Sequence, residues 1–196
     1  MEPKKAFKRL SDEKKQEFID KAIDLFLSVP YEDITMRMLN EMLGINPATF
    51  YRYFDSKDAL YLYIYHVITQ KTPKNEGYIL WETPLSKMDS YTPYISERDR
   101  AFLSLVYKIP DHVFQMILDL YKDQELSEIR EYLTLDKSKG KLREDVDIDF
   151  LVWLLFTVRN QLYLYVRQNK SVDENSKLFN LVFKDLLRNG IYKHNS

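Results

Sequence analysis

Apolar residues recur every three or four positions along most of the chain, which is the spacing of one face of an α-helix. The first such stripe runs from Phe18 to Phe26. Ser11 stands ahead of it as an N-cap, followed by carboxylates that suit a first turn, and Pro30 comes after it as a stop signal. This pattern predicts a first helix between Ser11 and Pro30.

A second, shorter stripe is formed by Leu39 and Leu43, four residues apart. Thr35 is placed to cap the helix that carries them. Gly44 is expected to end this helix, because glycine adopts the left-handed conformation of a helix C-terminus at low cost. A short second helix is therefore predicted between Thr35 and Gly44.

The segment GINPATFYRYFDSKDAL, residues 44–60, predicts a third helix directly after the second. Asn46 suits its N-cap and Pro47 its first position, where the missing N–H group of proline costs nothing. Phe50 and Phe54 point to one side, which we expect to pack on the first two helices. The opposite side then carries Pro47, Ala48, Tyr51 and Arg52. An apolar anchor beneath an exposed polar side is typical of the recognition helix of a helix-turn-helix.

Ser56 is expected to begin a fourth helix that continues to about Lys71. The tyrosines in this stretch alternate as they do in strands, but the capping signal ahead of them favours a helix. The polar segment of residues 71–77 then breaks the pattern, and we expect a domain boundary there. The prediction is an N-terminal domain of residues 1–71 and a second domain of residues 72–196.

The second domain is also predicted to be helical, with longer helices at about 111–135, 148–166 and 173–189 and a polar loop at 136–145. The last two of these helices carry apolar residues on two sides, so each needs cover on both. Packing both pairs together in a homodimer satisfies this requirement. Alternatively, one of the two is the core helix of a monomer. The predicted fold class is therefore all-α.

Composition narrows the classes of protein that fit. The chain has no cysteine, which excludes disulfides and thiol chemistry, and no apolar run long enough for a membrane helix, which favours the cytoplasm. The three histidines are scattered, and the acidic cluster at 144–149 precedes a helix whose positive end it stabilises. We therefore expect no enzyme, no cofactor and no metal site.

Charge is distributed unevenly. The formal net charge of −1 argues against wholesale coating of nucleic acid, yet the opening segment MEPKKAFKRL holds four cations and one acid. Two interpretations of this segment remain open: a solvated, frayed terminus, or an arm that touches DNA phosphates.

The stretch ITMRMLNEMLGINPATFYRYFDSKDAL, residues 34–60, closely resembles the DNA-binding signature of the TetR (tetracycline repressor) family of bacterial transcriptional regulators. The shared features are a Thr-x-Arg helix start, glycine at the turn, Thr-x-Tyr in the recognition helix, a following Phe and then Ser-Lys. With the first helix, the resemblance covers roughly residues 12–68. It implies double-stranded DNA as the partner and DNA contacts by Thr35, Arg37, Asn46, Pro47, Ala48, Thr49, Tyr51, Arg52, Tyr53 and Lys57.

Within this set, the resemblance places residues 46–49 at the groove. The residues that it implies as phosphate contacts are Tyr51, Tyr53 and Lys57. Side-chain chemistry leaves Arg37 and Arg52 as the bidentate candidates for reading bases. Two positions depart from the family pattern, since Asn40 replaces a small residue that packs on the recognition helix and Tyr53 replaces a histidine.

Beyond residue 72 the resemblance implies architecture only, namely a helical domain that binds an effector and forms a homodimer through the last two long helices. The aromatic residues of this domain suit an apolar or aromatic small molecule, with Arg159 as a possible polar anchor. The candidate ligand-binding residues are Phe102, Tyr107, Phe114, Tyr121, Trp153, Phe156, Asn160 and Tyr163. The competing interpretation is that most of them are plain core.

The implied function is a repressor that binds a palindromic operator as a dimer and leaves it when a small-molecule effector binds. The two recognition helices of such a dimer are expected to lie about 34 to 36 Å apart, one turn of DNA. The alternative is a DNA-binding protein of the same fold that works without an effector. No membrane partner is implied in either case.

Overall fold

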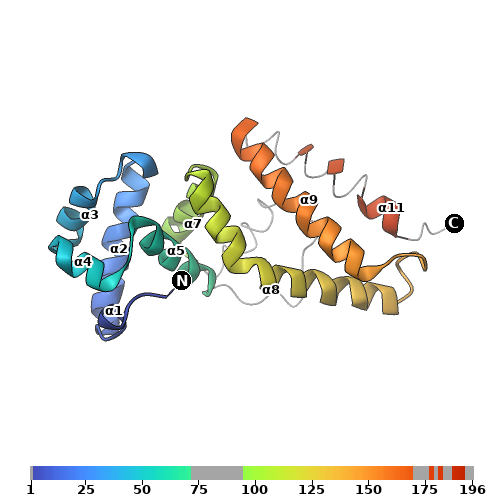
Figure 1. Cartoon of the computed structure of the whole chain (residues 1–196), viewed down its shortest axis with the longest axis horizontal. Coiled ribbons are helices and arrows are strands. Elements are labelled where there is room, and N and C mark those ends of the chain that lie inside the picture. The colour runs from blue at the N-terminus through green and yellow to red at the C-terminus, as the bar shows by residue number, and fades with distance from the viewer. Residues whose placement is uncertain (1, 72–94, 170–176, 179–180, 183–186, 193–196) are drawn as a thin grey trace. The chain divides into compact units, whose positions relative to one another are not determined.

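The computed structural model of the chain describes residues 2–71, 95–169, 177–178, 181–182 and 187–192 (Figure 1). The regular structure of these residues is helical, with one isolated bridge between Leu142 and Tyr192. The elements are, in chain order, α1 (Lys5–Lys8), α2 (Asp12–Ser28), η1 (Tyr31–Asp33), α3 (Met36–Leu43), α4 (Pro47–Tyr53), α5 (Lys57–Thr69), α7 (Glu97–Ser104), η2 (Leu105–Tyr107), α8 (Asp111–Ser138), α9 (Ile148–Asn169) and α11 (Asn189–Ile191).

The predicted N-terminal helix starts are confirmed, because each predicted cap side chain accepts a hydrogen bond from a main-chain N–H group three residues further on. The acceptors are Ser11 (3.4 Å), Thr35 (3.2 Å), Asn46 (2.8 Å) and Ser56 (3.1 Å). Gly44 ends α3 with φ 67° and ψ 33°, in the left-handed region as expected. Four of the N-terminal helices are thus specified by residues within a few positions of their ends.

The core beneath α3 and α4 is built from the apolar residues that the periodicity singled out. Phe50 and Phe54 are both buried, as are Leu39 and Leu43 of α3. The ring of Phe54 packs against the ring of Phe18 of α2, with centroids 5.9 Å apart. The predicted anchor of the third helix is therefore confirmed.

The opening segment is ordered rather than frayed, which corrects one of the two interpretations offered for it. Residues 5–8 form α1, and the side chain of Phe7 is fully buried. Its ring lies among those of Phe18, Phe54 and two tyrosines. Burial of this one aromatic side chain offsets the entropy cost of ordering so short a segment.

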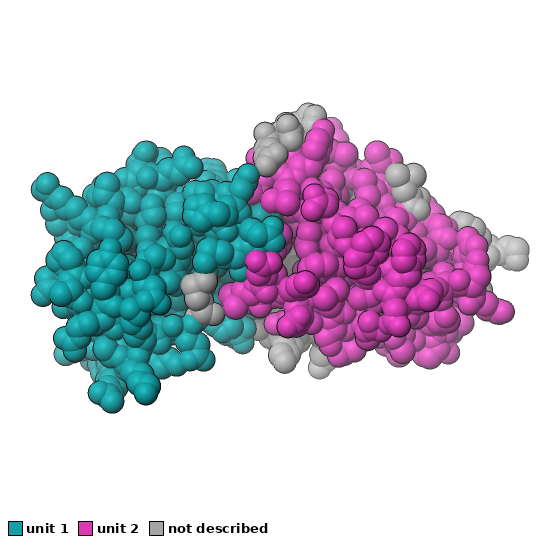
Figure 2. All heavy atoms as spheres, in the orientation of Figure 1, with its two compact units in different colours: residues 1–73, 92–117 teal, residues 74–91, 118–196 magenta. Residues whose placement is uncertain are grey.

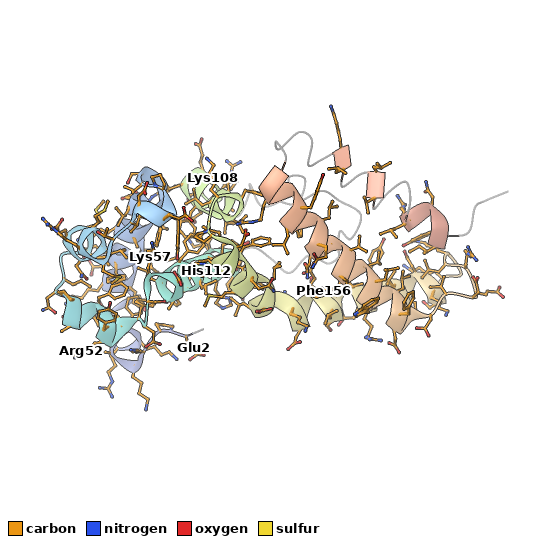
Figure 3. The ribbon with its side chains drawn as sticks, turned by 45° about the horizontal axis from the view of Figure 1, so that its top comes forward. Glu2, Arg52, Lys57, Lys108, His112 and Phe156 are labelled. Atoms are coloured by element: carbon orange, nitrogen blue, oxygen red, sulfur yellow. The ribbon has the colours of Figure 1, made fainter. Side chains whose placement is uncertain are left out.

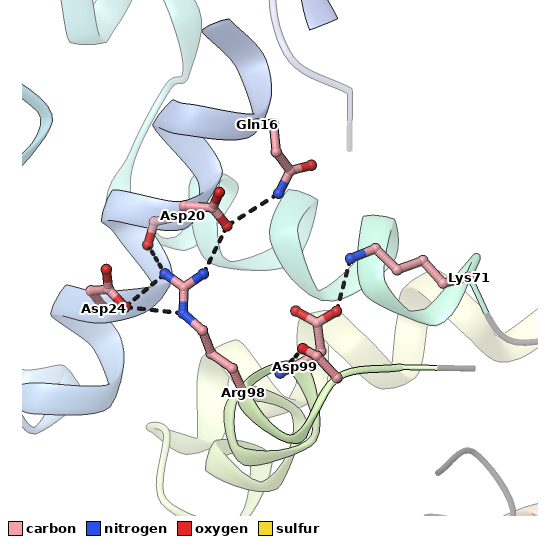
Figure 4. Close-up of polar contacts among 7 residues, drawn as sticks. Gln16, Asp20, Asp24, Lys71, Arg98 and Asp99 are labelled. Carbon is pink, nitrogen blue, oxygen red and sulfur yellow. Dashed lines mark hydrogen bonds and ion pairs between the residues drawn. The ribbon is translucent and has the colours of Figure 1, made fainter. Parts of the chain in front are cut away.

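The chain divides into two compact units, residues 1–73 with 92–117 and residues 74–91 with 118–196 (Figure 2). The sequence placed the boundary after residue 71, whereas in the structure α7 belongs to the first unit. Figure 4 shows why: Arg98 of α7 binds the carboxylates of Asp20 (2.8 Å) and Asp24 (2.6 Å) on α2. The next residue of α7, Asp99, pairs with Lys71 at 2.8 Å.

The second unit contains most of α8 and all of α9. The apolar core that they share consists of Ile129, Leu133, Leu142, Leu151, Val152 and Leu155. Helix α8 extends to Ser138, slightly into the stretch predicted as a loop, and Gly140 follows it with φ 69°. The helix predicted at 173–189 lies largely outside the described residues.

Candidate DNA-binding interface

The turn between α3 and α4 is closed by main-chain hydrogen bonds. The N–H group of Gly44 donates to the carbonyl of Glu41 at 3.2 Å, and that of Ile45 donates to the carbonyl of Asn40 at 3.0 Å. Helix α4 then begins at Pro47, three residues after Gly44. This short, glycine-containing turn between two helices is the geometry of a helix-turn-helix.

The face of α4 opposite its anchors is open to solvent. Asn46, Pro47, Ala48, Tyr51 and Arg52 are exposed, and Thr49 is half-buried. Arg52 is labelled in Figure 3. Tyr51 is 49% exposed although its neighbour Phe50 is completely buried. Helical periodicity therefore separates a buried apolar side from an exposed side that carries a hydroxyl group and a guanidinium group.

The candidate residues of α3 are also exposed. Thr35 caps the helix with its side-chain oxygen, and Arg37 follows two positions later. The Nε atom of Arg37 lies 2.7 Å from a carboxylate oxygen of Glu41. This hydrogen bond raises the pKa of Arg37 above its usual value. A surface pair of this kind dissociates at low cost, so Arg37 is able to exchange Glu41 for another partner.

Lys57 lies at the start of α5, and its ammonium group has acceptors within the domain that the sequence did not indicate. Its ammonium group donates to the carbonyls of Tyr31 (2.7 Å) and Ile34 (2.9 Å) and lies 4.3 Å from the centre of the Tyr31 ring. Burial lowers the pKa of Lys57, and nearby carboxylates led by Asp58 oppose that shift. Two of its three donors thus fasten the start of α5 to η1, and the half-buried Lys57 is labelled in Figure 3.

The same region holds a second link between η1 and α5. The hydroxyl group of Tyr31 donates to a carboxylate oxygen of Asp58 at 2.5 Å, and burial raises the pKa of Tyr31 far above its usual value. The other carboxylate oxygen of Asp58 lies 3.5 Å from His112. Asp58 is therefore a structural residue of the N-terminal unit.

Tyr53, which the resemblance also implies as a phosphate contact, is half-buried at the end of α4. Its ring lies 5.6 Å from that of Phe7 and 5.9 Å from that of Phe18. These edge-on contacts hold the ring of Tyr53 against the aromatic core.

Lys4 belongs to the cationic opening segment, and its contacts with α4 were not predicted from the sequence. Its ammonium group donates to the carbonyl of Tyr51 at 2.8 Å, and its main-chain N–H group donates to the carbonyl of Tyr53 at 2.9 Å. Both acceptors lie in the last turn of α4. The available signal was the apolar Phe7 within an otherwise cationic segment, which marks a residue that needs cover.

Asn40, which replaces a small residue of the family pattern, is buried in the structure. It lies on α3, and its side-chain oxygen has no hydrogen-bond partner among the described residues. A buried amide without a partner costs free energy. The position is therefore a local weak point of the α3 packing.

The candidate ligand-binding residues are divided between the two compact units. Phe102, Tyr107 and Phe114 belong to the first unit, and the remaining five belong to the second. Phe102 is fully buried, 4.8 Å from the ring of Tyr61 and 5.9 Å from that of Phe26, so it is a core residue of the N-terminal unit. Trp153 is instead 57% exposed and lies beside the ring of Phe150.

Polar residues in the second unit form a small buried group on α9. Arg159 is only 2% exposed, and its Nε atom lies 3.1 Å from the hydroxyl group of Tyr163 and 3.5 Å from a carboxylate oxygen of Glu125. Asn160 is buried beside it, and among the described residues its side-chain oxygen has no hydrogen-bond partner. A buried ion pair next to an unsatisfied amide is costly, so this group calls for a functional explanation.

The described residues hold neither a metal site nor a membrane-spanning helix. No group of three or more histidine and carboxylate side chains there is placed to hold a metal ion. Within the same residues, no helix combines the length and the hydropathy needed to span a bilayer.

Comparison with known proteins agrees with the helix-turn-helix. Residues 18–64 match a family model described as bacterial regulatory proteins, tetR family. No curated protein matches the sequence.

Solved structures with a similar fold include a TetR-family transcriptional regulator from Pectobacterium atrosepticum, with a TM-score of 0.63 and 12% identity over 95% of this chain and 100% of that one. Another is NalD of Pseudomonas aeruginosa, the secondary repressor of a multidrug efflux pump. Its TM-score is 0.58, with 13% identity over 95% of this chain and 100% of that one. A third, from Saccharomonospora viridis, is described as a transcriptional regulator in complex with choline. Its TM-score is 0.56, with 19% identity over 94% of this chain and 100% of that one. At these identities the likeness is one of fold.

Proposed function

The N-terminal part of this chain is the DNA-binding domain of the bacterial tetR-family regulatory proteins, and we propose that the protein is a repressor released from a palindromic operator by a small molecule. The protein is accordingly a DNA-binding transcriptional regulator and not an enzyme. The observation that carries the proposal is α4, whose anchors are buried while Tyr51 and Arg52 face solvent. We assign its place of action to the cytoplasm, where its DNA lies.

The DNA contacts that we propose divide by chemistry. The hydroxyl groups of Tyr51 and Tyr53 donate to phosphates, and Arg37 and Arg52 are the residues able to bind base edges with two hydrogen bonds. Asn46, Pro47, Ala48 and Thr49 line the groove, with Thr35 at the start of α3. We assign Lys57 a supporting role for this surface, because its half-buried ammonium group is bound to main-chain carbonyls.

Binding as a homodimer is supported by an exposed aromatic pair on α9. Phe150 and Trp153 are 59% and 57% exposed, and their ring centroids are 5.9 Å apart. Large adjacent aromatic side chains in solvent are typical of an interface. A second copy of the chain is the partner that a palindromic operator requires, since protein and operator then share one two-fold axis.

Release by an effector is supported by the second unit. The buried polar group around Arg159 and Asn160 offers hydrogen bonds within an apolar helix pair, which suits recognition of a small molecule. Proteins of this fold include one bound to choline. Helix α5 is the proposed relay, because the ring of Tyr63 on α5 lies 5.6 Å from that of Phe54 at the end of α4 and because Lys71, just after α5, pairs with Asp99 of α7. Release requires the effector to bind one arrangement of these helices more tightly than the other.

The test begins with selection of bound duplexes from a random-sequence DNA pool by the wild-type protein. A palindromic consensus is expected, and affinity for it is then measured for Tyr51→Phe across a range of salt concentrations. The matched control is Tyr165→Phe, because Tyr165 on α9 is 48% exposed, close to the 49% of Tyr51. We expect weaker binding for Tyr51→Phe alone, since it loses one hydrogen bond to phosphate. Failure to enrich any sequence refutes the function.

A further inference from the structure

The first residues of the chain bind the C-terminal end of the recognition helix. The ammonium group of Lys4 donates to the carbonyl of Tyr51 at 2.8 Å and lies 2.6 Å from a carboxylate oxygen of Asp55. Its main-chain N–H group donates to the carbonyl of Tyr53 at 2.9 Å. One residue therefore supplies two hydrogen bonds and a positive charge to the end of α4.

This end of a helix needs such partners. The last carbonyls of a helix have no intrahelical donor, and together they carry a partial negative charge that a cation stabilises. Helix α4 has only seven residues, so its last turn is a large part of its length. Lys4 satisfies two of the carbonyls in that turn, those of Tyr51 and Tyr53, from a position far earlier in the sequence.

Phe7 fixes the same segment on its other side. Its fully buried ring lies 4.9 Å from that of Phe54, 5.2 Å from Phe18 of α2 and 5.5 Å from Tyr63 of α5. Pro3 is buried as well. The segment 3–8 thus packs where α2, α4 and α5 meet, and we call it the N-terminal brace.

We propose that the N-terminal brace is a positioning element that holds α4 in the orientation needed for operator binding, and that Lys4 acts through α4 rather than by touching DNA. The proposal rests on the proposed DNA-binding function. Lys4 binds the main-chain carbonyl of Tyr51, the residue whose hydroxyl group is assigned to a phosphate. The brace lies outside residues 18–64, the part that matches the family model.

The opposing interpretation, a cationic arm that touches phosphates, makes a different prediction. A phosphate contact contributes to the salt dependence of binding, at about 0.9 in the slope of log affinity against log salt for each neutralised phosphate. A positioning residue changes affinity and leaves that slope as it is. The two roles of Lys4 are therefore separable by one titration series.

The experiment compares Lys4→Met with Lys5→Met in the full-length chain. Both variants lose one charge and keep the aliphatic stem, but Lys5 is exposed on α1 and serves as the matched control. Affinity is measured for the duplex that the wild type enriches from a random pool, at several salt concentrations. Amide hydrogen exchange of peptides from α4 is measured in the free protein, by mass spectrometry.

For Lys4→Met we expect about fivefold weaker operator binding with an unchanged salt slope, because an interaction at a helix end is lost. We also expect faster exchange in α4 than in wild type or Lys5→Met. Binding and α4 exchange equal to those of Lys5→Met overturn the proposal. So does a slope reduced by about 0.9 with unaltered exchange, which identifies a phosphate contact.

The exchange comparison needs no DNA, and this keeps the two hypotheses apart. A wild-type protein that enriches no sequence refutes the DNA-binding function, while α4 exchange still decides whether the brace orders that helix. If instead the wild type enriches an operator and Lys4→Met behaves as Lys5→Met in both measurements, only the brace is refuted.

Discussion

Replacing Lys57 with methionine tests whether this residue supports the domain or contacts DNA. The change removes the ammonium group and keeps a side chain of similar length. Two hydrogen bonds are lost, to the carbonyls of Tyr31 at 2.7 Å and Ile34 at 2.9 Å, together with the contact 4.3 Å above the Tyr31 ring. The carbonyls left behind are partly covered, so water replaces the lost donors incompletely.

The size of the effect follows from these contacts. Hydrogen bonds to a charged group contribute about 1.5 to 3 kcal/mol each in mutational series. The ammonium group of Lys57 is only half-buried, and its lowered pKa shows that burial already disfavours its charged form. Because solvent screens a half-buried group, the two bonds together are expected to contribute about 2 kcal/mol, less than the roughly 3 kcal/mol that two such bonds contribute at the lower limit of that range. We expect Lys57→Met to lower the free energy of unfolding by this amount.

The assay is urea unfolding of the full-length chain followed by circular dichroism, combined with operator binding across salt concentrations. Arg52→Met is the control, because Arg52 is exposed on α4 and is proposed to contact DNA. For Arg52→Met we expect unfolding within about 0.5 kcal/mol of wild type and weaker operator binding. If Lys57→Met unfolds like wild type while its salt slope falls by about 0.9, the assignment of Lys57 to an internal role is refuted.

Three further predictions concern the N-terminal unit. Gly44→Ala is expected to cost about 1 kcal/mol of unfolding free energy, because φ of 67° strains an L-residue although no atom lies within 4 Å of the added Cβ; an unchanged urea midpoint contradicts this. Arg98→Met, which frees Asp20 and Asp24, should cost about 1 to 2 kcal/mol in the same assay and weaken exchange protection in α2. Since burial raises the pKa of Tyr31, its contribution to stability is present below about pH 10 and is lost as the pH rises further. Tyr31→Phe should therefore flatten the alkaline loss of stability, and an unaltered pH profile contradicts the assignment.

Local sequence determined the helix-turn-helix. The caps at Thr35, Asn46 and Ser56 and the stop at Gly44 act on main-chain groups within a few residues, so their effects are readable from order along the chain. Helical periodicity placed Phe50 on the buried side of its helix for the same reason. The fold class and the exposed face of α4 followed from these short-range signals and from the family resemblance.

Tertiary structure decided which partners the long side chains find. Lys57 had every appearance of a surface cation beside a helix start, yet its acceptors are carbonyls 26 and 23 residues away. Lys4 and Phe7 belong to a segment for which the sequence left both a frayed terminus and a DNA-contacting arm open, and their partners lie on helices much later in the chain. Arg98 of α7 binds carboxylates of the first unit that lie 78 and 74 residues away. Such pairings depend on which helix surfaces meet, and that is set by packing of the whole unit rather than by neighbours in sequence.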